Sequence, residues 1–256
     1  MKIQYCSDLH LEFEENNRYV IKNKLVPQGE LLLLAGDILP FQLDHRTYAF
    51  FDEVAANFEA VYWVPGNHEY YGGDMTIIAD PLYKEIRENV FLINNHTLHY
   101  KGINIIASTL WSHISPNKEL ILQRGLADFY AIRRQGGPFL PVHFNELHQA
   151  SLQFIKKEVT RLIGSPKIVV SHHVPTLKHY PPKYKNSRLQ EGFAIELHNY
   201  IETSDINYWV YGHHHFNTPA FDIGKTKLLT NQLGYVRKHE HRSYVNNAVI
   251  EINGSG

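Results

Sequence analysis

Seven side chains that could bind metal ions lie in five short blocks of the sequence. The blocks combine aspartate, histidine and asparagine with glycine or serine, and they are Asp8-Leu9-His10, Gly36-Asp37, Gly66-Asn67-His68-Glu69, Ser171-His172-His173 and Gly212-His213-His214-His215. The expected ligands are Asp8, His10, Asp37, Asn67, His172, His213 and His215. Their donor atoms are oxygen and imidazole nitrogen, with no thiolate. This set suits Mn, Fe, Zn or Co and argues against a closed structural zinc site.

The number of donors indicates two metal ions. Seven ligands are too many for one ion, whereas two ions that share a carboxylate would use them all. Two ions about 3.5 to 4 Å apart are the usual arrangement for displacement at phosphorus. In an extended segment, residues two apart point to the same side, so Asp8 and His10 can face one site together, as can His213 and His215. The sequence therefore predicts a dinuclear centre.

Each of these blocks follows an apolar run of strand length. Strands are predicted at Ile3 to Cys6, Leu31 to Ala35, Val61 to Val64, Ile103 to Ala107, Lys167 to Val170 and Tyr208 to Tyr211. Helices are predicted at about 44–58, 74–88, 143–162 and 189–203, and three further strands at 218–223, 227–231 and 243–252. This is an α/β pattern. Ligands of open α/β sheets bind at the carboxyl ends of the strands, where all five blocks lie.

Length and charge limit the possible functions. A chain of 256 residues suits a single domain over 1–256. We expect an insertion resembling a cap at about 112–141, which includes the breaker Gly136-Gly137-Pro138, and a long polar loop at 175–190. A net charge of -1 argues against extended nucleic-acid binding. The single cysteine, Cys6, and the lack of any long apolar segment predict a cytoplasmic protein that does not enter membranes.

The ordered blocks resemble the signature of the calcineurin-like metallophosphoesterase superfamily, which reads D-x-H, GD, GNH with an acidic residue, H after a strand, and GHxH. The resemblance extends from Tyr5 to His215. Ile38-Leu39-Pro40 follows Asp37 where the Ser/Thr protein phosphatase branch has D-R-G, so the chain is more similar to the bacterial members. The implied fold is α/β, a four-layer αββα sandwich of two mixed sheets with the dinuclear site at the carboxyl ends of the strands.

The resemblance also implies a role for each donor. One ion would be held by Asp8, His10, Asp37 and His215, and the other by Asp37, Asn67, His172 and His213. Asp37 would bridge two divalent or trivalent ions, for which Mn, Fe and Zn are the candidates. A metal-bridging hydroxide would then hydrolyse a phosphoester, and His68 would assist the leaving group. The expected substrates are small phosphomonoesters, phosphodiesters or nucleotides.

Several alternatives remain open from the sequence. His173 could replace His172 as the ligand, and His68 could simply orient Asp8 or a water molecule. Basic residues of the insertion and the long loop could contact substrate, with His113, Arg133 and His179 as tentative candidates, although solvated surface charge is the favoured explanation for any single one of them. Another function to consider is a nuclease or cyclic-nucleotide phosphodiesterase, and a remoter one is a non-catalytic metal-binding scaffold. The oligomeric state cannot be predicted.

Overall fold

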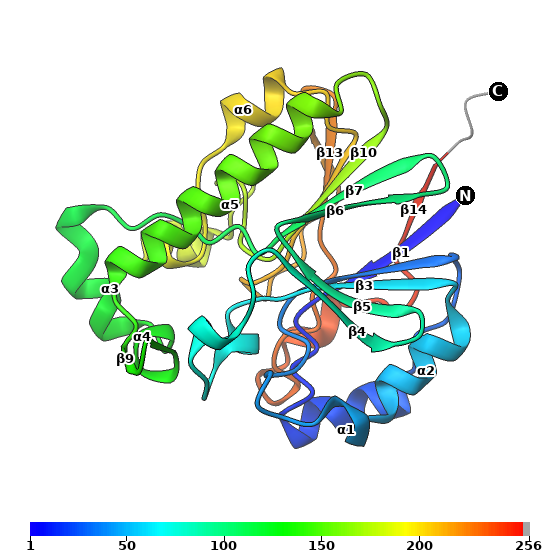
Figure 1. Cartoon of the computed structure of the whole chain (residues 1–256), viewed down its shortest axis with the longest axis horizontal. Helices are drawn as coiled ribbons and strands as arrows, with labels where there is room; N and C mark the ends of the chain where they lie inside the picture. The colour runs from blue at the N-terminus through cyan, green and yellow to red at the C-terminus, as the bar shows by residue number, and fades with distance from the viewer. Residues whose placement is uncertain (253–256) are drawn as a thin grey trace.

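The computed structural model describes residues 1–252, which fold around two six-stranded sheets (Figure 1). In each sheet four central strands run parallel, and an antiparallel strand flanks them on both sides. The first sheet has the order β14-β1-β2-β3-β5-β4, and the second has the order β12-β13-β11-β10-β7-β6. Both sheets are therefore mixed, as the sequence predicted.

The first sheet combines the N-terminal strands with one strand from the end of the chain. Its members are β1 (Lys2–Cys6), β2 (Leu31–Ala35), β3 (Ala60–Val64), β4 (Leu82–Arg87), β5 (Val90–Asn94) and β14 (Val249–Glu251). The second sheet contains β6 (His96–Tyr100), β7 (Ile103–Ser108), β10 (Lys167–Ser171), β11 (Tyr208–Val210), β12 (Phe221–Ile223) and β13 (Thr226–Leu229). A small ribbon of β8 (Arg133–Arg134) and β9 (Gly137–Pro138) lies outside both sheets.

Helices cover the outer face of each sheet, which makes a four-layer αββα sandwich (Figure 1). The helices are α1 (Glu14–Lys22), α2 (Ala49–Asn57), α3 (Glu119–Gly125), α4 (Asp128–Ala131), α5 (Pro141–Arg161) and α6 (His198–Thr203). One apolar cluster joins the two sheets through residues such as Leu33 and Ile105. Another cluster packs α2 on the first sheet, and a third packs α5 and α6 on the second. These three apolar layers confirm the predicted fold class.

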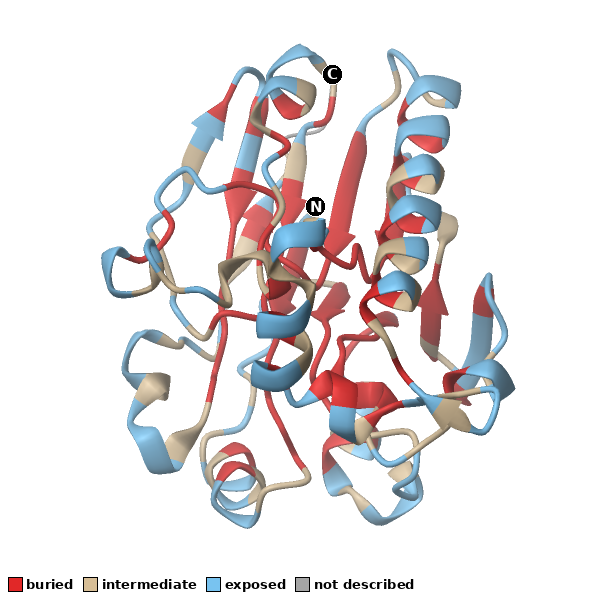
Figure 2. Cartoon of the chain, turned by 90° about the vertical axis from the view of Figure 1, so that its left-hand side faces the viewer, coloured by how far each residue is buried: buried red, intermediate tan, exposed pale blue. Residues whose placement is uncertain are grey.

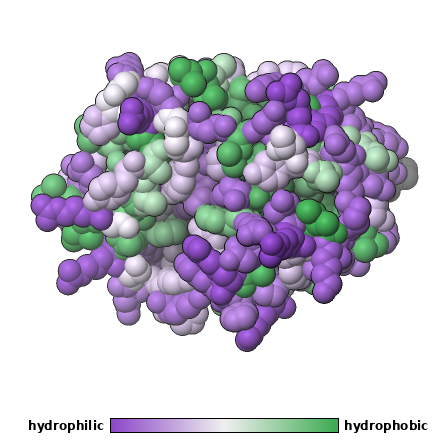
Figure 3. Space-filling view, turned by 90° about the horizontal axis from the view of Figure 1, so that it is seen from below, coloured by the Kyte–Doolittle hydropathy of each residue, from purple (hydrophilic) through white to green (hydrophobic). Residues whose placement is uncertain are grey.

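Burial follows this layering. The central strands are buried almost throughout, whereas the helices are buried only on the side that faces a sheet (Figure 2). Seen from below, apolar side chains lie in small patches among hydrophilic ones (Figure 3). No helix within residues 1–252 combines the length and the apolar character that crossing a membrane requires.

Most of the predicted elements are present, with one clear error. The bounds of β2 are the predicted ones. Each of the other four strands that precede a block differs from its predicted bounds by one residue at one end. The helix predicted at 74–88 is wrong, because this segment forms the short turn Met75–Ile77 and the strand β4. Leu82 and Ile86 are the buried positions of β4, and a spacing of four fits both a helix and a strand. The helix predicted at 189–203 is confined to α6.

The segments predicted as an insertion and a long loop both lie beside the carboxyl ends of the strands. Residues 112–141 form α3, α4 and the small ribbon, and they pack around a separate apolar cluster that includes Trp111, Phe139 and Phe144. Residues 175–190 contain one short helical turn, Pro182–Tyr184. Of the single domain proposed over 1–256, the last four residues lie outside the described part.

Candidate dinuclear metal centre

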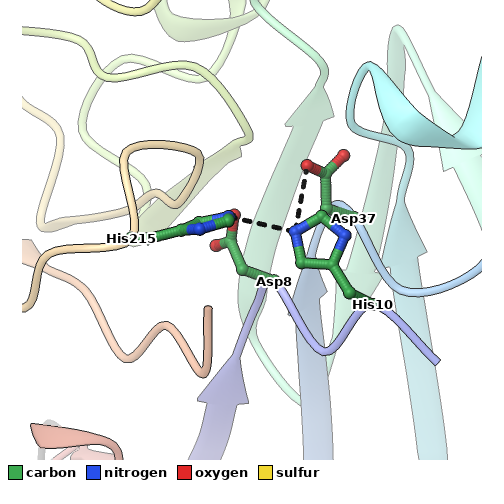
Figure 4. A group of neighbouring side chains, drawn as sticks. All are labelled: Asp8, His10, Asp37 and His215. Carbon is green, nitrogen blue, oxygen red and sulfur yellow. Dashed lines mark hydrogen bonds and ion pairs between the residues drawn. The ribbon is translucent and has the colours of Figure 1, made fainter. Parts of the chain in front are cut away.

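Four of the predicted ligands converge at the carboxyl ends of β1 and β2 (Figure 4). Asp8, His10, Asp37 and His215 each place one ligand atom within 4.8 Å of the others. Nε2 of His10 lies 3.0 Å from Nε2 of His215 and 3.6 Å from Oδ2 of Asp37. Ligand atoms that share one ion at about 2.0 to 2.2 Å are separated by roughly 3 to 4 Å, so these distances fit a single ion.

A second group contains Asp37, His172 and His213. Nε2 of His172 lies 3.0 Å from Nδ1 of His213, 3.2 Å from Oδ1 of Asn67 and 3.3 Å from Oδ1 of Asp37. Asp37 therefore turns Oδ2 toward the first group and Oδ1 toward the second. This is the arrangement that a bridging carboxylate requires. The donor set and the spacing of these atoms are thus compatible with two ions that share Asp37.

The backbone is unusual at five of the seven donors. Positive φ angles occur at Asp8 (56°), His10 (47°), Asp37 (54°), His213 (81°) and His215 (48°). Left-handed conformations of residues other than glycine cost of order 1–3 kcal/mol each and cluster at functional sites. The turns that follow these strands therefore place the donors at some conformational cost, which supports a role in ligand binding.

The structure separates His172 from His173. His172 points into the second group, and its Nδ1 lies 2.9 Å from the carbonyl oxygen of Ala35, which fixes the ring. His173 instead packs against Trp111 and Phe144, and neither of its ring nitrogens has a hydrogen-bond partner among residues 1–252. Burial lowers the pKa of His173 well below its ordinary value, so the ring is neutral. The geometry favours His172 as the ligand.

His68 lies beside the two groups and belongs to neither of them. Its Nδ1 faces Oε1 of Glu12 at 3.2 Å, and its Nε2 lies 3.4 Å from the hydroxyl of Tyr235. The ring stacks on Tyr71 with 4.2 Å between centroids. Burial lowers the pKa of His68, but the negative charges of Asp37 and Glu12 outweigh it, so the pKa is raised above its ordinary value. The residue can therefore carry a proton near neutral pH.

Glu69, within the third block, holds two of the ligand loops together. Its side chain is fully buried, and it accepts hydrogen bonds from the backbone N–H groups of Asp37, Ile38 and Gly66 at 2.7 to 2.9 Å. The indole Nε1 of Trp63 donates to the same carboxylate at 2.9 Å. One side chain thus fixes the turns after β2 and β3. The sequence marked Glu69 as part of a motif but gave no indication of this role.

Three further carboxylates contact ligand side chains, and the sequence did not predict them. Oε1 of Glu12 lies 3.1 Å from Nδ1 of His10, and Oε2 of Glu240 lies 2.7 Å from Nδ1 of His215. Oδ1 of Asp128 accepts from Nδ2 of Asn67 at 2.7 Å. Groups of this kind fix the orientation of metal ligands. Glu12 had a signal, because it continues the two-residue spacing of Asp8 and His10, whereas Asp128 and Glu240 had none.

A cavity of about 360 Å³ opens onto the site. Asp37, Asn67, His68, His213 and His215 line it on the metal side. The insertion contributes residues 125–128, and the long loop contributes residues between 180 and 190. Both segments therefore form walls of the cavity.

The three tentative substrate contacts do not line this cavity. His113 lies next to His148 on α5, Arg133 lies in β8, and the ring of His179 packs on Phe221. Each of them projects elsewhere because the insertion and the loop face the cavity through other residues, including Asp128, Tyr184 and Leu189. Spacing along a loop does not determine which side chains face inward.

Comparison with known proteins agrees with this geometry. A family model described as calcineurin-like phosphoesterase matches residues 1–217. Uncharacterized protein L509 of Acanthamoeba polyphaga mimivirus is 30% identical, over 98% of this chain and 96% of the relative. The phosphopantetheinyl hydrolase of Mycobacterium tuberculosis has a similar structure, with a TM-score of 0.63 and 16% identity over 94% of this chain and 92% of that one. At this identity, the structural similarity shows a shared fold.

Proposed function

The chain belongs to the calcineurin-like phosphoesterase family and is a phosphoester hydrolase, and from this premise we propose that it cleaves small phosphoesters with two metal ions and His68. The observation that carries the proposal is the position of Asp37, whose two oxygens face separate groups of ligands while His68 stands beside both. Metal-dependent phosphoester hydrolysis is the chemistry of the family. The residue roles and the class of substrate are our proposal.

The seven donors would hold two ions, one in each group. Bound at these positions, Mn, Fe or Zn ions supply a hydroxide nucleophile at neutral pH and neutralise charge on the phosphoryl oxygens. The protein contributes a rigid frame, since Glu12, Asp128 and Glu240 fix the side chains of three donors. A rigid frame of this kind would hold a bound phosphoester in one orientation, which favours attack on phosphorus from the side opposite the leaving group.

His68 is the proposed general acid. The carboxylate of Glu12 accepts a hydrogen bond from the Nδ1–H group of His68, so Nε2 is the nitrogen that can donate a proton to the departing alkoxide. The hydroxyl of Tyr235, 3.4 Å from Nε2, limits the position of the ring. The backbone N–H of His68 also donates to Oδ1 of Asp37 at 3.0 Å, which ties the acid to the bridging carboxylate. If His68 only orients other groups, its replacement by alanine should lower kcat by less than the loss of a general acid would.

The cavity favours a small substrate over a nucleic-acid chain. Its volume, about 360 Å³, lies at the lower end of the range for small-molecule sites. Of the residues that line it within 1–252, Lys238 is the one lysine or arginine. A nuclease would need a longer basic surface to contact successive phosphates. The seven ligands and His68 are all present, which argues against a non-catalytic scaffold.

The test is hydrolysis by protein loaded with Mn, Fe or Zn. We expect turnover of p-nitrophenyl phosphate or bis-p-nitrophenyl phosphate, and the ratio of the two rates will show whether monoesters or diesters are preferred. His68→Ala should lower kcat by about 10²- to 10⁴-fold, the usual contribution of a general acid, without loss of metal. Asp37→Ala should abolish both activity and binding of two ions. Absence of turnover above the Asp37→Ala background with every metal would refute the proposal.

A further inference from the structure

One side of the cavity is lined by apolar and aromatic side chains. Leu126 comes from the insertion, Tyr184 and Leu189 come from the long loop, and Phe193 follows the loop. Phe193 stacks on the ring of His213 with 4.8 Å between centroids. Tyr71 stacks on His68 in the same way. This apolar wall, defined by these five residues, therefore begins directly beside the proposed general acid.

The two segments of the wall interlock through leucine and glycine. A Cβ atom at Gly125 would lie 2.5 Å from Cδ2 of Leu189, and one at Gly192 would lie 2.3 Å from Cδ1 of Leu126. Each leucine thus occupies the space that a side chain on the opposite segment would need. The insertion and the loop consequently form one continuous surface, although about 60 residues separate them in sequence.

Few charged side chains line this part of the cavity, although Nζ of Lys183, which is not among the lining residues, lies 4.5 Å from the centroid of the Tyr184 ring. The ammonium group of Lys238 lies over the ring of Tyr235, with Nζ 4.7 Å from its centroid, and Glu240 lies nearby in the same cavity. Asp128 adds a further carboxylate, already engaged by Asn67 and Tyr71. Among the lining residues on this side, Asp128 and Glu240 are carboxylates and Lys238 is the one ammonium group, so the lining gives a leaving group with a second phosphate or a carboxylate little positive charge to contact. An uncharged ring would instead exchange water for apolar and aromatic contacts.

We propose that the apolar wall binds the leaving group of the substrate, and that this leaving group carries an uncharged aromatic ring. The proposal rests on the proposed phosphoesterase function, because it assumes that the phosphate group binds next to the metal ligands and that the leaving group lies next to His68. It specifies the substrate class as phosphoesters of aromatic alcohols or of nucleosides, and it excludes polyanionic leaving groups.

The test separates binding from hydrolysis by using phosphonates, which are not cleaved. Benzylphosphonate, methylphosphonate and phosphonoacetate share the phosphonate group and differ in an aromatic, a minimal and an anionic substituent. Calorimetric titration of the Mn-loaded protein should show benzylphosphonate binding roughly 5- to 150-fold more tightly than methylphosphonate, the range expected for stacking on an aromatic side chain. Phosphonoacetate should bind no more tightly than methylphosphonate.

Substitutions test whether the apolar wall causes the preference for benzylphosphonate. Tyr184→Ala should reduce the preference for benzylphosphonate over methylphosphonate, while Tyr184→Phe should keep it. Tyr83→Ala, which removes an aromatic ring that is 52% exposed on β4, is the matched control and should change nothing. Equal binding of the benzyl and methyl compounds, tighter binding of phosphonoacetate, or a preference insensitive to Tyr184→Ala would overturn the proposal.

Failure of the proposed function would look different. If benzylphosphonate is preferred but no phosphoester is hydrolysed with any metal, the wall binds aromatic ligands and the hydrolytic role is wrong. If p-nitrophenyl esters are hydrolysed but the three phosphonates bind with equal affinity, the protein is a phosphoesterase and the proposal that the wall binds an aromatic leaving group is wrong. A comparison of benzyl and ethyl phosphate, whose alcohols have similar acidity, extends the test to kcat/KM.

Discussion

Replacement of Asp128 by alanine should weaken one metal site and leave the other intact. Asp128 belongs to the insertion and is 3% exposed. Its Oδ1 accepts from Nδ2 of Asn67 at 2.7 Å and from the hydroxyl of Tyr71 at 2.6 Å. The contact to Nδ2 leaves Oδ1 of Asn67 facing His172. Without Asp128, the amide can rotate and turn its NH₂ group, which cannot bind a cation, toward the ion.

The expected size of the effect follows from similar contacts in metal sites. Removal of a group that orients a ligand typically lowers metal affinity by about 10- to 100-fold, which corresponds to about 1.4 to 2.7 kcal/mol. The other ion should be unaffected, because none of its ligands contacts Asp128. The fold should also survive. Asn67 and Tyr71 would each lose one hydrogen bond, at a cost of about 1–3 kcal/mol, but they keep the hydrogen bond between them. Burial also raises the pKa of Asp128, so removing its carboxylate recovers part of that cost.

The assay is a competition titration of Mn²⁺ or Zn²⁺ against a chromophoric chelator, which resolves two affinities. Asp128→Ala should lower one of them, whereas Glu240→Gln, at the contact with His215, should lower the other. Tyr71→Phe removes a hydroxyl that contacts both Asp128 and Asn67 but keeps the hydrogen bond between these two residues, so it should lower the same affinity by less than Asp128→Ala does. Equal losses at both sites in Asp128→Ala, or no loss at either, would refute this explanation of how Asn67 is oriented.

Three further predictions follow from the geometry. Gly66→Ala should prevent binding of both ions, because the new Cβ would lie 2.2 Å from Oδ1 of Asp37 and 2.7 Å from Nε2 of His172. Elemental analysis of the purified protein should show the loss of metal, and circular dichroism should show little change in secondary structure. Glu69→Ala should lower the free energy of unfolding in urea by at least about 3 kcal/mol, since it leaves several buried donors unpaired, and Glu69→Gln should cost less. Burial lowers the pKa of His148 below its ordinary 6.5, so the folded protein loses stability as the pH falls below 6.5 and the unfolded chain binds the proton first. His148→Asn should remove this pH dependence, which amounts to at most about 1.4 kcal/mol per pH unit, and thermal melts between pH 7 and pH 5 would measure it.

The strands that carry the ligands could be predicted because they are buried on both faces. A parallel strand between a layer of helices and a second sheet reads as an unbroken apolar run, as in Leu31–Ala35. The polar residues directly after such a run must then lie at the edge of the sheet. Strand β4 lacks this signal, since it lies at the end of its sheet with Leu82 and Ile86 buried among exposed residues. Its pattern was therefore mistaken for a helix.

The carboxylates around the ligands were harder to predict than the ligands. Glu12 lies two residues beyond His10 and is therefore near it in sequence, but the left-handed backbone at Asp8 and His10 shows that the segment is a turn and not the extended strand that the spacing suggested. Asp128 is 61 residues from Asn67, and Glu240 is 25 residues from His215. Both depend on the path of irregular segments, for which periodicity gives no information. The same reason explains why His113, Arg133 and His179 were proposed to face the substrate and do not line the cavity.

The insertion contributes to both the metal site and the substrate cavity, and this has a consequence for specificity. Leu126 lines the proposed leaving-group site, and Asp128, two residues later, holds Asn67. A change that moves this segment to admit a different leaving group must also move the carboxylate that orients a metal ligand. Substrate preference and the affinity of the second ion should therefore change together in variants of residues 125–128. Residues 180–190 of the long loop make no hydrogen bond to the seven ligands within the described chain, so variants of the loop that keep Leu189, which packs on Gly125, should alter preference alone.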